Sequence, residues 1–347
     1  MSFRRLEADD FVVSSEAISS TCWTTNAPQL TTFFTSSTQA NGSSGTYYLN
    51  TFDSATTSSV QFAIAYGNGQ GSGSTVYNTA VNGLSPTSTI FGQWQDLVIG
   101  DENTNFVFGN ITSSEFFALP IERACYKDSL FLGSLTLNLS GSSGSISLTD
   151  NSSLYSINGL PVQFNEAGRI FQLVSGSAGS INTSVNANGY SVNSGSYGWL
   201  LPDIGTIILN PLALAAPAIS GGIGLIYSGS AFSGSATYTP TTNANAQLYR
   251  AISGSGAFTL NSQETITSDF IFVRPRSSEF NYSENPSFIS GSTGAVLYPQ
   301  FINNPQVYIT TIGLYNDTNQ LLAVAKLSRP LTKDFTKEAL VRVKLDF

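Results

Sequence analysis

Short runs in which apolar and polar residues alternate make up much of this chain, and Ser, Gly and Asn separate them. The run LTLNLS at 135–140 alternates strictly, and the stretch from Gln29 to Tyr66 is rich in aromatic and β-branched residues. A period of two places one side of a strand in a core and the other side in water. We therefore predict an all-β protein with a multi-domain, sandwich- or barrel-like architecture and very short helices only.

Further strands are predicted in the apolar runs that follow, which include Ile90–Ile99, Asn105–Ile111 and 169–174. Helix is expected only in two short pieces, near Leu212–Ser220 and near Asp334–Leu340. Two prolines limit the first piece to about two turns, because proline cannot donate within a helix.

The clearest pattern lies toward the C-terminal end. Residues 307–315 and 321–327 form two strand-like runs around the polar turn NDTNQ, which predicts a hairpin. Within the run 339–347, residues 341–347 alternate strictly, so we expect this strand to share one sheet with the hairpin in a compact C-terminal sandwich. The residues expected in the core of that sandwich are Ile309, Leu314, Leu322, Val324, Val341, Val343 and Leu345.

Changes in composition divide the chain into four segments. Residues 1–24 resemble an extended arm whose few apolar side chains lie among charges, so we expect this arm to become ordered only in an assembly. The arm is followed by an N-terminal β domain over 25–139 and by a middle β domain over 140–264 that is rich in Ser, Gly and Asn. A C-terminal β-sandwich domain over 265–347 ends the chain.

Charge is scarce and unevenly placed. Charged residues make up 10% of the chain, against about 25% in an average protein, and the net charge is −8. Six of the 14 basic residues nevertheless lie in the last 22 positions. A basic end on an acidic chain can bind acidic surfaces on neighbouring copies or partners, although a solvated strand face is the alternative. The candidate assembly interface comprises Lys326, Arg329, Arg342 and Lys344, with Phe3 and Phe11 of the arm.

Few residues suit catalysis or metal binding. The chain has no histidine, which excludes Ser-His-Asp and Cys-His catalysis and His-ligated metals. Cys22 and Cys125 cannot complete a zinc site and are expected to be buried thiols, with a disulfide as the alternative. The glycine-rich run 67–75 lacks the Lys-Ser/Thr of a phosphate loop, and Asp101 and Glu102 sit in a turn, although a glycosidase needs only two carboxylates. We expect no enzyme activity, no catalytic residue, no metal and no cofactor.

Nucleic acid and membranes are also poor partners for this composition. A net negative chain repels phosphate, and the basic C-terminal strand lacks interleaved aromatic residues. The longest apolar stretch, Ile207–Ile226, is interrupted by prolines and glycines, so we expect no membrane insertion. The N-terminal residues have no apolar signal core, which predicts synthesis and assembly in the cytoplasm.

Residues 309–335 (ITTIGLYNDTNQLLAVAKLSRPLTKDF) resemble a hairpin of phage tail-fibre and baseplate-associated domains. Asn319 stands where that family has a turn glycine, and Pro330 and Lys333 continue the match loosely. More diffusely, the chain is similar to virion structural proteins of large contractile-tailed phages over the stretches 122–141, 145–152, 172–181 and 194–211. The residues that carry the hairpin match are Ile312, Gly313, Leu314, Tyr315, Asn316, Asp317, Leu321, Ala323 and Val324.

The resemblance implies a non-enzymatic structural protein of a phage virion, placed in the tail baseplate or the fibre-attachment region. Such a protein assembles in the host cytoplasm and contacts copies of itself and other virion proteins. One alternative is a glycan- or receptor-binding module of a tail fibre or tip. Its candidate contacts to a host-surface glycan are Trp23, Trp94 and Trp199, although we expect each of these residues in a core. A neck or head-decoration protein is a further alternative.

Overall fold

Antiparallel strands joined by short helices dominate the structure, which confirms the predicted all-β class. The structure is a computed structural model. It describes residues 3–35, 43–44, 48–54, 59–74, 76–77, 86–158, 162–182, 195–227, 244–283 and 285–346.

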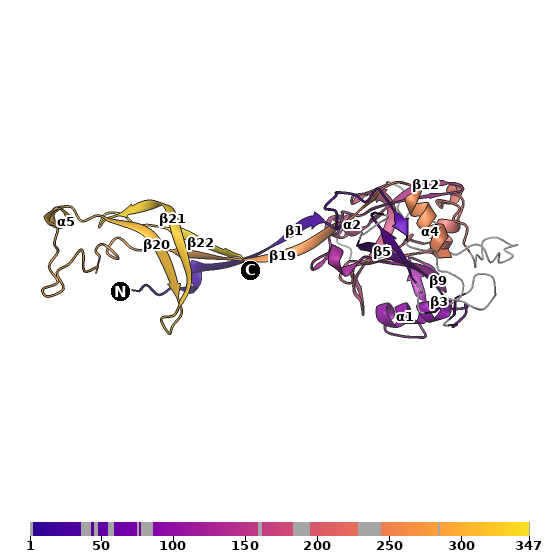
Figure 1. Ribbon diagram of the computed structural model, residues 1–347, viewed down its shortest axis with the longest axis horizontal. Helices are drawn as coiled ribbons and strands as arrows, with labels where there is room; N and C mark the ends of the chain where they lie inside the picture. The colour runs from indigo at the N-terminus through magenta and orange to yellow at the C-terminus, as the bar shows by residue number, and fades with distance from the viewer. Residues whose placement is uncertain are drawn as a thin grey trace. The chain divides into compact units, whose positions relative to one another are not determined.

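The chain forms two compact units (Figure 1). The main unit spans Ile18–Glu264, and the terminal unit combines Met1–Ala17 with Thr265–Phe347. The two domains predicted over 25–139 and 140–264 are not separate, because strands from both segments belong to one sheet. The rise in Ser, Gly and Asn content suggested a boundary at residue 140. The sheet nevertheless continues across this position.

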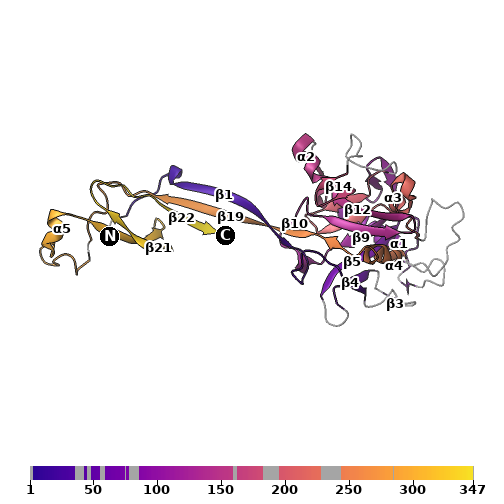
Figure 2. The same cartoon turned by 90° about the horizontal axis from the view of Figure 1, so that it is seen from above.

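A 12-stranded antiparallel sheet builds the main unit (Figure 2). Its two ends approach each other, because the backbones of Leu30 and Phe258 exchange hydrogen bonds of 2.8 and 2.9 Å. The sheet therefore curls around an apolar interior. From one end to the other its strands are β18 (Phe258–Thr259), β11 (Thr136–Gly141), β12 (Gly144–Asp150), β14 (Gly168–Ser177), β16 (Gly198–Leu201), β17 (Thr206–Leu209), β9 (Glu115–Pro120), β5 (Val60–Asn68), β4 (Leu49–Phe52) and β2 (Phe34–Thr35), with β13 (Gln163–Asn165) and β15 (Ser180–Ile181) paired to β14.

Alternate residues of the central strands face two different cores. In β9, Phe117 lies in the larger core together with residues of helix α4 (Ala244–Ser253). Its neighbour Phe116 lies in the second core, to which helix α1 (Thr87–Ile99) contributes. Because both faces of β16 and β17 are covered, every residue of these strands is buried, and their sequences are apolar apart from Thr206 instead of alternating.

Helix α1 corrects the sequence prediction, which assigned a strand to Ile90–Ile99. Its buried residues Ile90, Trp94 and Val98 recur four positions apart, which is the spacing of one helix face. Gly100 ends the helix in a left-handed conformation at φ 74°, where its N–H donates to carbonyls of the last turn. Aromatic and β-branched residues occur in buried helices as well as in strands, so the composition of this run misled the prediction.

The other predicted helices are half confirmed. Near Leu212–Ser220 the chain forms α3 (Pro211–Ala215) and the 3-10 turn η3 (Ala218–Ser220). The helix predicted at 334–340 is absent from these described residues, where Asp334 accepts a hydrogen bond from the Thr336 N–H within a turn. The remaining short helices and 3-10 turns are η1 (Ala8–Asp10), η2 (Arg123–Cys125), α2 (Ser152–Asn158) and α5 (Pro299–Asn303).

The arm predicted over 1–24 is a strand for much of its length. Strand β1 (Phe11–Thr21) pairs with the long strand β19 (Asn261–Val273), and Cys22 and Trp23 lie buried in the larger core. Backbone pairing holds β1, whose side chains are exposed at ten of 11 positions. This is why its thin apolar content did not reveal a strand. Strand β10 (Ser129–Leu130) also pairs with β19, and the short pairs β3 (Ser43–Ser44) with β6 (Val76–Tyr77) and β7 (Phe106–Phe108) with β8 (Ile111–Ser113) complete the strands of the main unit.

The terminal unit contains two sheets. Strand β22 (Val341–Asp346) pairs with β19, whereas β20 (Val307–Tyr315) pairs only with β21 (Leu321–Lys333) among the described strands. The predicted hairpin is therefore confirmed, but its placement in one sheet with the last strand is wrong.

The expected C-terminal core is accordingly only partly formed. Val341 and Val343 are buried, but Leu322 and Val324 are 69% and 57% exposed. Along much of β21, exposed residues alternate with half-buried ones. The pattern therefore separates the two faces of a ribbon and does not indicate a fully buried face. Half-buried positions are Ile309, Leu314 and Leu345.

Candidate interaction surface

The hairpin β20–β21 exposes a row of apolar side chains. Leu322 and Val324 point to the same face because they are two residues apart in one strand, and Gly313 lies opposite Val324. A two-stranded sheet alone is marginally stable in water and needs a third strand or a second layer. A second molecule bound to this face would supply that layer. The hairpin surface is defined by the exposed apolar residues of the two strands, of which Tyr308 and Leu331 lie on opposite faces. These residues are Tyr308, Tyr315, Leu321, Leu322, Val324 and Leu331.

The turn between β20 and β21 is fixed by local hydrogen bonds. Asn319 adopts φ 60°, a left-handed conformation that glycine favours and asparagine tolerates. The side-chain oxygen of Asn316 accepts from the N–H groups of Thr318 and Gln320, at 3.1 and 2.8 Å. Asparagine at 319 therefore supports the left-handed position that this turn requires.

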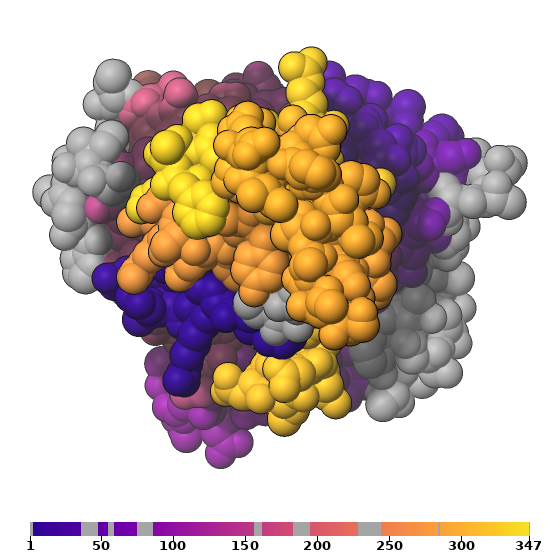
Figure 3. Space-filling view, turned by 90° about the vertical axis from the view of Figure 1, so that its left-hand side faces the viewer, coloured from indigo at the N-terminus to yellow at the C-terminus, as the bar shows by residue number. Residues whose placement is uncertain are grey.

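The two aromatic residues of the predicted interface are both exposed. Phe3 is 56% exposed, and its ring packs edge-on against Tyr315 of the hairpin with centroids 5.1 Å apart. Arg4, which follows it, pairs with Glu279 at 2.9 Å. Phe11 stands at the start of β1 and is partly exposed. The N-terminal residues thus belong to the surface of the terminal unit, and Figure 3 shows them in indigo beside the orange and yellow C-terminal residues.

The structure brings two of the four candidate basic residues together. Arg342 and Lys344 lie at exposed positions of β22, and both approach the ring of Phe270 on β19. The guanidinium carbon of Arg342 and the Nζ of Lys344 are 5.4 and 5.9 Å from the ring centroid. Lys344 also forms an ion pair of 2.8 Å with Asp346.

The other two basic residues extend the hairpin surface. Lys326 is two residues past Val324 in β21 and lies opposite Thr311, so its charge continues the apolar row. Arg329 is exposed further along the same strand. Within the described parts of the chain, neither Lys326 nor Arg329 forms an ion pair. Their charges are therefore free to meet carboxylates of another molecule.

The residues considered for chemistry serve local structure. No three His, Cys, Asp or Glu side chains cluster for a metal in the described chain. Cys22 and Cys125 are buried free thiols, and burial raises the pKa of Cys125 to about 11 and raises that of Cys22 more strongly. Asp101 accepts hydrogen bonds from the Thr104 hydroxyl and the Asn103 N–H, at 2.5 and 2.9 Å, and these bonds lower its pKa. This carboxylate closes its own turn.

The three tryptophans lie in the cores. Trp23, Trp94 and Trp199 are each less than one-tenth exposed. The indole N–H of Trp94 donates to the hydroxyl of Tyr48 at 3.0 Å. An aromatic platform for a sugar must be exposed, so these residues are not the glycan contacts that the receptor-binding alternative requires.

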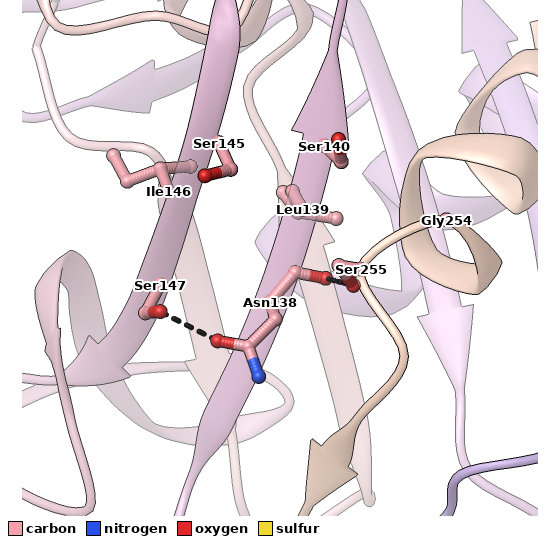
Figure 4. Close-up of a pocket in the computed structure, with 8 residues that line it drawn as sticks. All are labelled: Asn138, Leu139, Ser140, Ser145, Ile146, Ser147, Gly254 and Ser255. Carbon is pink, nitrogen blue, oxygen red and sulfur yellow. Dashed lines mark hydrogen bonds between the residues drawn. The ribbon is translucent and has the colours of Figure 1, made fainter.

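A shallow pocket lies between β11, β12 and the end of α4 (Figure 4). The side-chain oxygen of Asn138 accepts from the Ser147 hydroxyl at 2.5 Å, and its backbone carbonyl accepts from the Ser255 hydroxyl at 2.5 Å. The Asn138 amide nitrogen donates to the carbonyl of Ala257 at 3.0 Å. Because these polar groups already bond to one another, they offer little to a ligand. The lining residues are Asn138, Leu139, Ser140, Ser145, Ile146, Ser147, Gly254 and Ser255.

One half-buried carboxyl group was missed by sequence reasoning. Glu115 begins β9 in the main unit, and its Oε1 accepts from Asn68 at 3.2 Å. Burial raises the pKa of Glu115, while the neighbouring Tyr227 and Tyr66 hydroxyls oppose the shift. A single glutamate at the start of a strand is ordinarily solvated, so the sequence carries no signal for this environment.

Comparisons of the chain with protein-family models, with curated proteins and with solved structures found no match. Among the described helices, none combines the length and apolar character that a transmembrane helix needs.

Proposed function

We propose that this chain is a non-enzymatic structural component of a phage virion, in the tail baseplate or the fibre-attachment region. It acts through protein–protein contacts made by the terminal unit with copies of itself and with other virion proteins. The single observation that supports this most is the exposed apolar face of β20–β21, on which Leu322 and Val324 are 69% and 57% exposed.

Covering this apolar face with a protein partner is more favourable in free energy than leaving it in water. Along much of both strands, alternate residues are half-buried, whereas most other positions remain exposed. Large exposed apolar patches ordinarily mark interaction sites. Burying apolar area contributes about 25 cal/mol per Å², so covering even a few of these side chains contributes several kcal/mol. Catalysis would need convergent polar groups in a cleft, and the shallow pocket at Asn138 holds groups that already bond to one another.

A second copy of the chain is the occupant that charge favours. The apolar row on β21 continues into Lys326, Arg329 is exposed further along the strand, and the chain as a whole is acidic at −8. A basic patch on one copy can therefore meet acidic surface on the next. Paired contacts of this kind fix orientation, while the apolar row supplies most of the affinity.

Sedimentation of the purified chain over a range of concentrations tests the self-association. We expect oligomers for the wild type and a shift toward monomer for the double variant Leu322→Lys with Val324→Lys. The matched control is Leu97→Lys on α1, which replaces a leucine that is 50% exposed in the main unit. Equal association of all three proteins would overturn the role of the hairpin surface.

The virion assignment needs its own measurement. Quantitative mass spectrometry of purified particles should find the chain at a fixed ratio to the tail proteins, and density at the baseplate should accommodate both units. A chain that is abundant in the lysate but missing from purified particles would contradict the assignment.

A further inference from the structure

Lys333, at the end of β21, is the buried lysine of the chain. It is 0% exposed, whereas the other four lysines are exposed. A buried ammonium ordinarily pairs with a carboxylate, because desolvating a charge is costly. No described carboxylate forms an ion pair with Lys333. Its Nζ donates instead to Asn281 Oδ1 at 2.7 Å and to the Ser277 carbonyl at 3.1 Å.

Asn281 is held in place on its side of this contact. It is 3% exposed, and its amide nitrogen donates to the Ser277 carbonyl at 2.7 Å. Phe280, directly before it, adopts φ 52°, a left-handed conformation that is strained for a residue with a side chain. Such strain persists only where the surroundings enforce it, and it concentrates at functional positions. The turn therefore fixes the amide of Asn281 against Lys333.

The surroundings favour the reactive form of the lysine. Burial lowers the pKa of Lys333, and the opposing charges of Asp334, Glu279 and Glu338 do not cancel this effect. The neutral amine, which is the nucleophilic form, is therefore more populated than on a surface lysine. The amide carbon of Asn281 lies one bond beyond the oxygen that Nζ contacts, so nucleophile and electrophile are within reach of each other.

We propose that Lys333 and Asn281 join in an intramolecular isopeptide bond. Nζ attacks the amide carbon Cγ of Asn281, the Nζ–Cγ bond forms, and the bond from Cγ to Nδ2 breaks. The ammonium of Lys333 gives up two protons in becoming an amide N–H, and the departing Nδ2 takes up both and leaves as ammonium. No oxidant or other reactant is required.

The bond would tie the segment around Asn281 to the end of β21 across 52 positions of the chain. That segment contains no strand between Val273 and Val307 apart from the bridge of Ile289 with Val296 in its described residues. A covalent tie restricts the unfolded chain and resists forced opening, as other long-range cross-links do. The cross-link is independent of whether the hairpin surface binds another copy.

Mass spectrometry of the intact, denatured full-length chain tests the proposal. We expect a mass below that of the sequence by one molecule of ammonia. Trypsin should then release residues 277–326 joined to residues 327–337, because cleavage after an acylated Lys333 is blocked. The joined peptide separates this bond from asparagine cyclisation, which loses ammonia within a single peptide.

Three variants sharpen the test. Asn281→Asp should lose water and reach the same final mass as the wild type, because both reactions give one product, although the unreacted masses differ. Lys333→Arg should keep its full mass, and the control Lys326→Arg should lose ammonia as the wild type does. A wild-type chain of full sequence mass that yields two separate peptides would overturn the proposal and leave Lys333 as a hydrogen-bond donor only.

Discussion

The guanidinium carbon of Arg342 lies 5.4 Å from the ring centroid of Phe270 on the neighbouring strand β19. Lys344 approaches the same ring, so two positive charges share one exposed patch. Reversing both (Arg342→Glu with Lys344→Glu) should leave folding intact, since each cation–ring contact at an exposed site contributes only about 0.5–1 kcal/mol. Assembly should be slowed or blocked, more severely at low salt, where repulsion is least screened.

The matched control has the same net charge as this double variant, but its reversed charges lie in the main unit. Lys127→Glu with Arg250→Glu changes two exposed basic residues of the main unit by the same amount. Light scattering at several salt concentrations should show normal assembly for this control. If the Arg342 and Lys344 reversal assembles equally well at every salt concentration, the patch is a solvated strand face.

Two leucines with the same side chain should respond very differently to truncation. Leu209 is 0% exposed in the larger core, so Leu209→Ala should lower the free energy of unfolding by about 2–5 kcal/mol. Leu322→Ala removes an exposed side chain and should change the free energy of unfolding by no more than about 0.5 kcal/mol. Urea unfolding measures both changes, at protein concentrations too low for the chain to self-associate. A large loss for Leu322→Ala would indicate that the hairpin surface is covered within the isolated chain.

Local pattern predicted the strands well where pairing partners are close in sequence. The hairpin predicted at 307–327 followed from its two strand-like runs and its polar turn, and the structure pairs Gly313 with Val324 across it. Alternation does not say which sheet a strand joins, so β22 was placed beside the hairpin although it pairs with β19. The same limit hid β1, whose partner lies about 250 positions away in the chain.

Burial explains the remaining differences. The exposed positions of Lys326, Arg329, Arg342 and Lys344 followed from strand periodicity, because charged residues rarely enter a core. The burial of Lys333, in the same run of basic residues, depends on the segment around Asn281 folding over it, and no local pattern encodes that contact.

A glycine in the main sheet should be irreplaceable. Gly198 adopts φ 150°, and a Cβ added there would lie 1.9 Å from the carbonyl oxygen of Ile208 on the neighbouring strand β17. Both atoms belong to a fully buried strand pair that cannot move apart cheaply. Gly198→Ala should therefore destabilise the main unit by more than about 3 kcal/mol or prevent folding. Gly92→Ala is the control, because a Cβ on this exposed helix position meets no atom within 4 Å. It should be neutral or slightly stabilising in thermal unfolding.

The stability of the folded chain should depend on pH because Glu115 binds its proton more tightly when folded. Burial raises its pKa in the folded chain above the ordinary value of 4.5. The folded state therefore binds more protons than the unfolded state between these two pKa values. The stabilising contribution of Glu115 is fully present below about pH 4.5 and is lost as the pH rises through the folded pKa. Each unit of pKa difference corresponds to about 1.4 kcal/mol.

The variant Glu115→Gln should remove this dependence while its side-chain oxygen still accepts from Asn68. We expect the variant to gain stability relative to the wild type at neutral pH, and the gain to shrink as the pH falls through the folded pKa of Glu115 toward 4.5. Urea unfolding of both proteins at pH 4 and pH 8 measures the difference, with Glu102→Gln as the control at an exposed carboxylate. A gain that is equal at both pH values would show that the carboxyl group of Glu115 titrates normally.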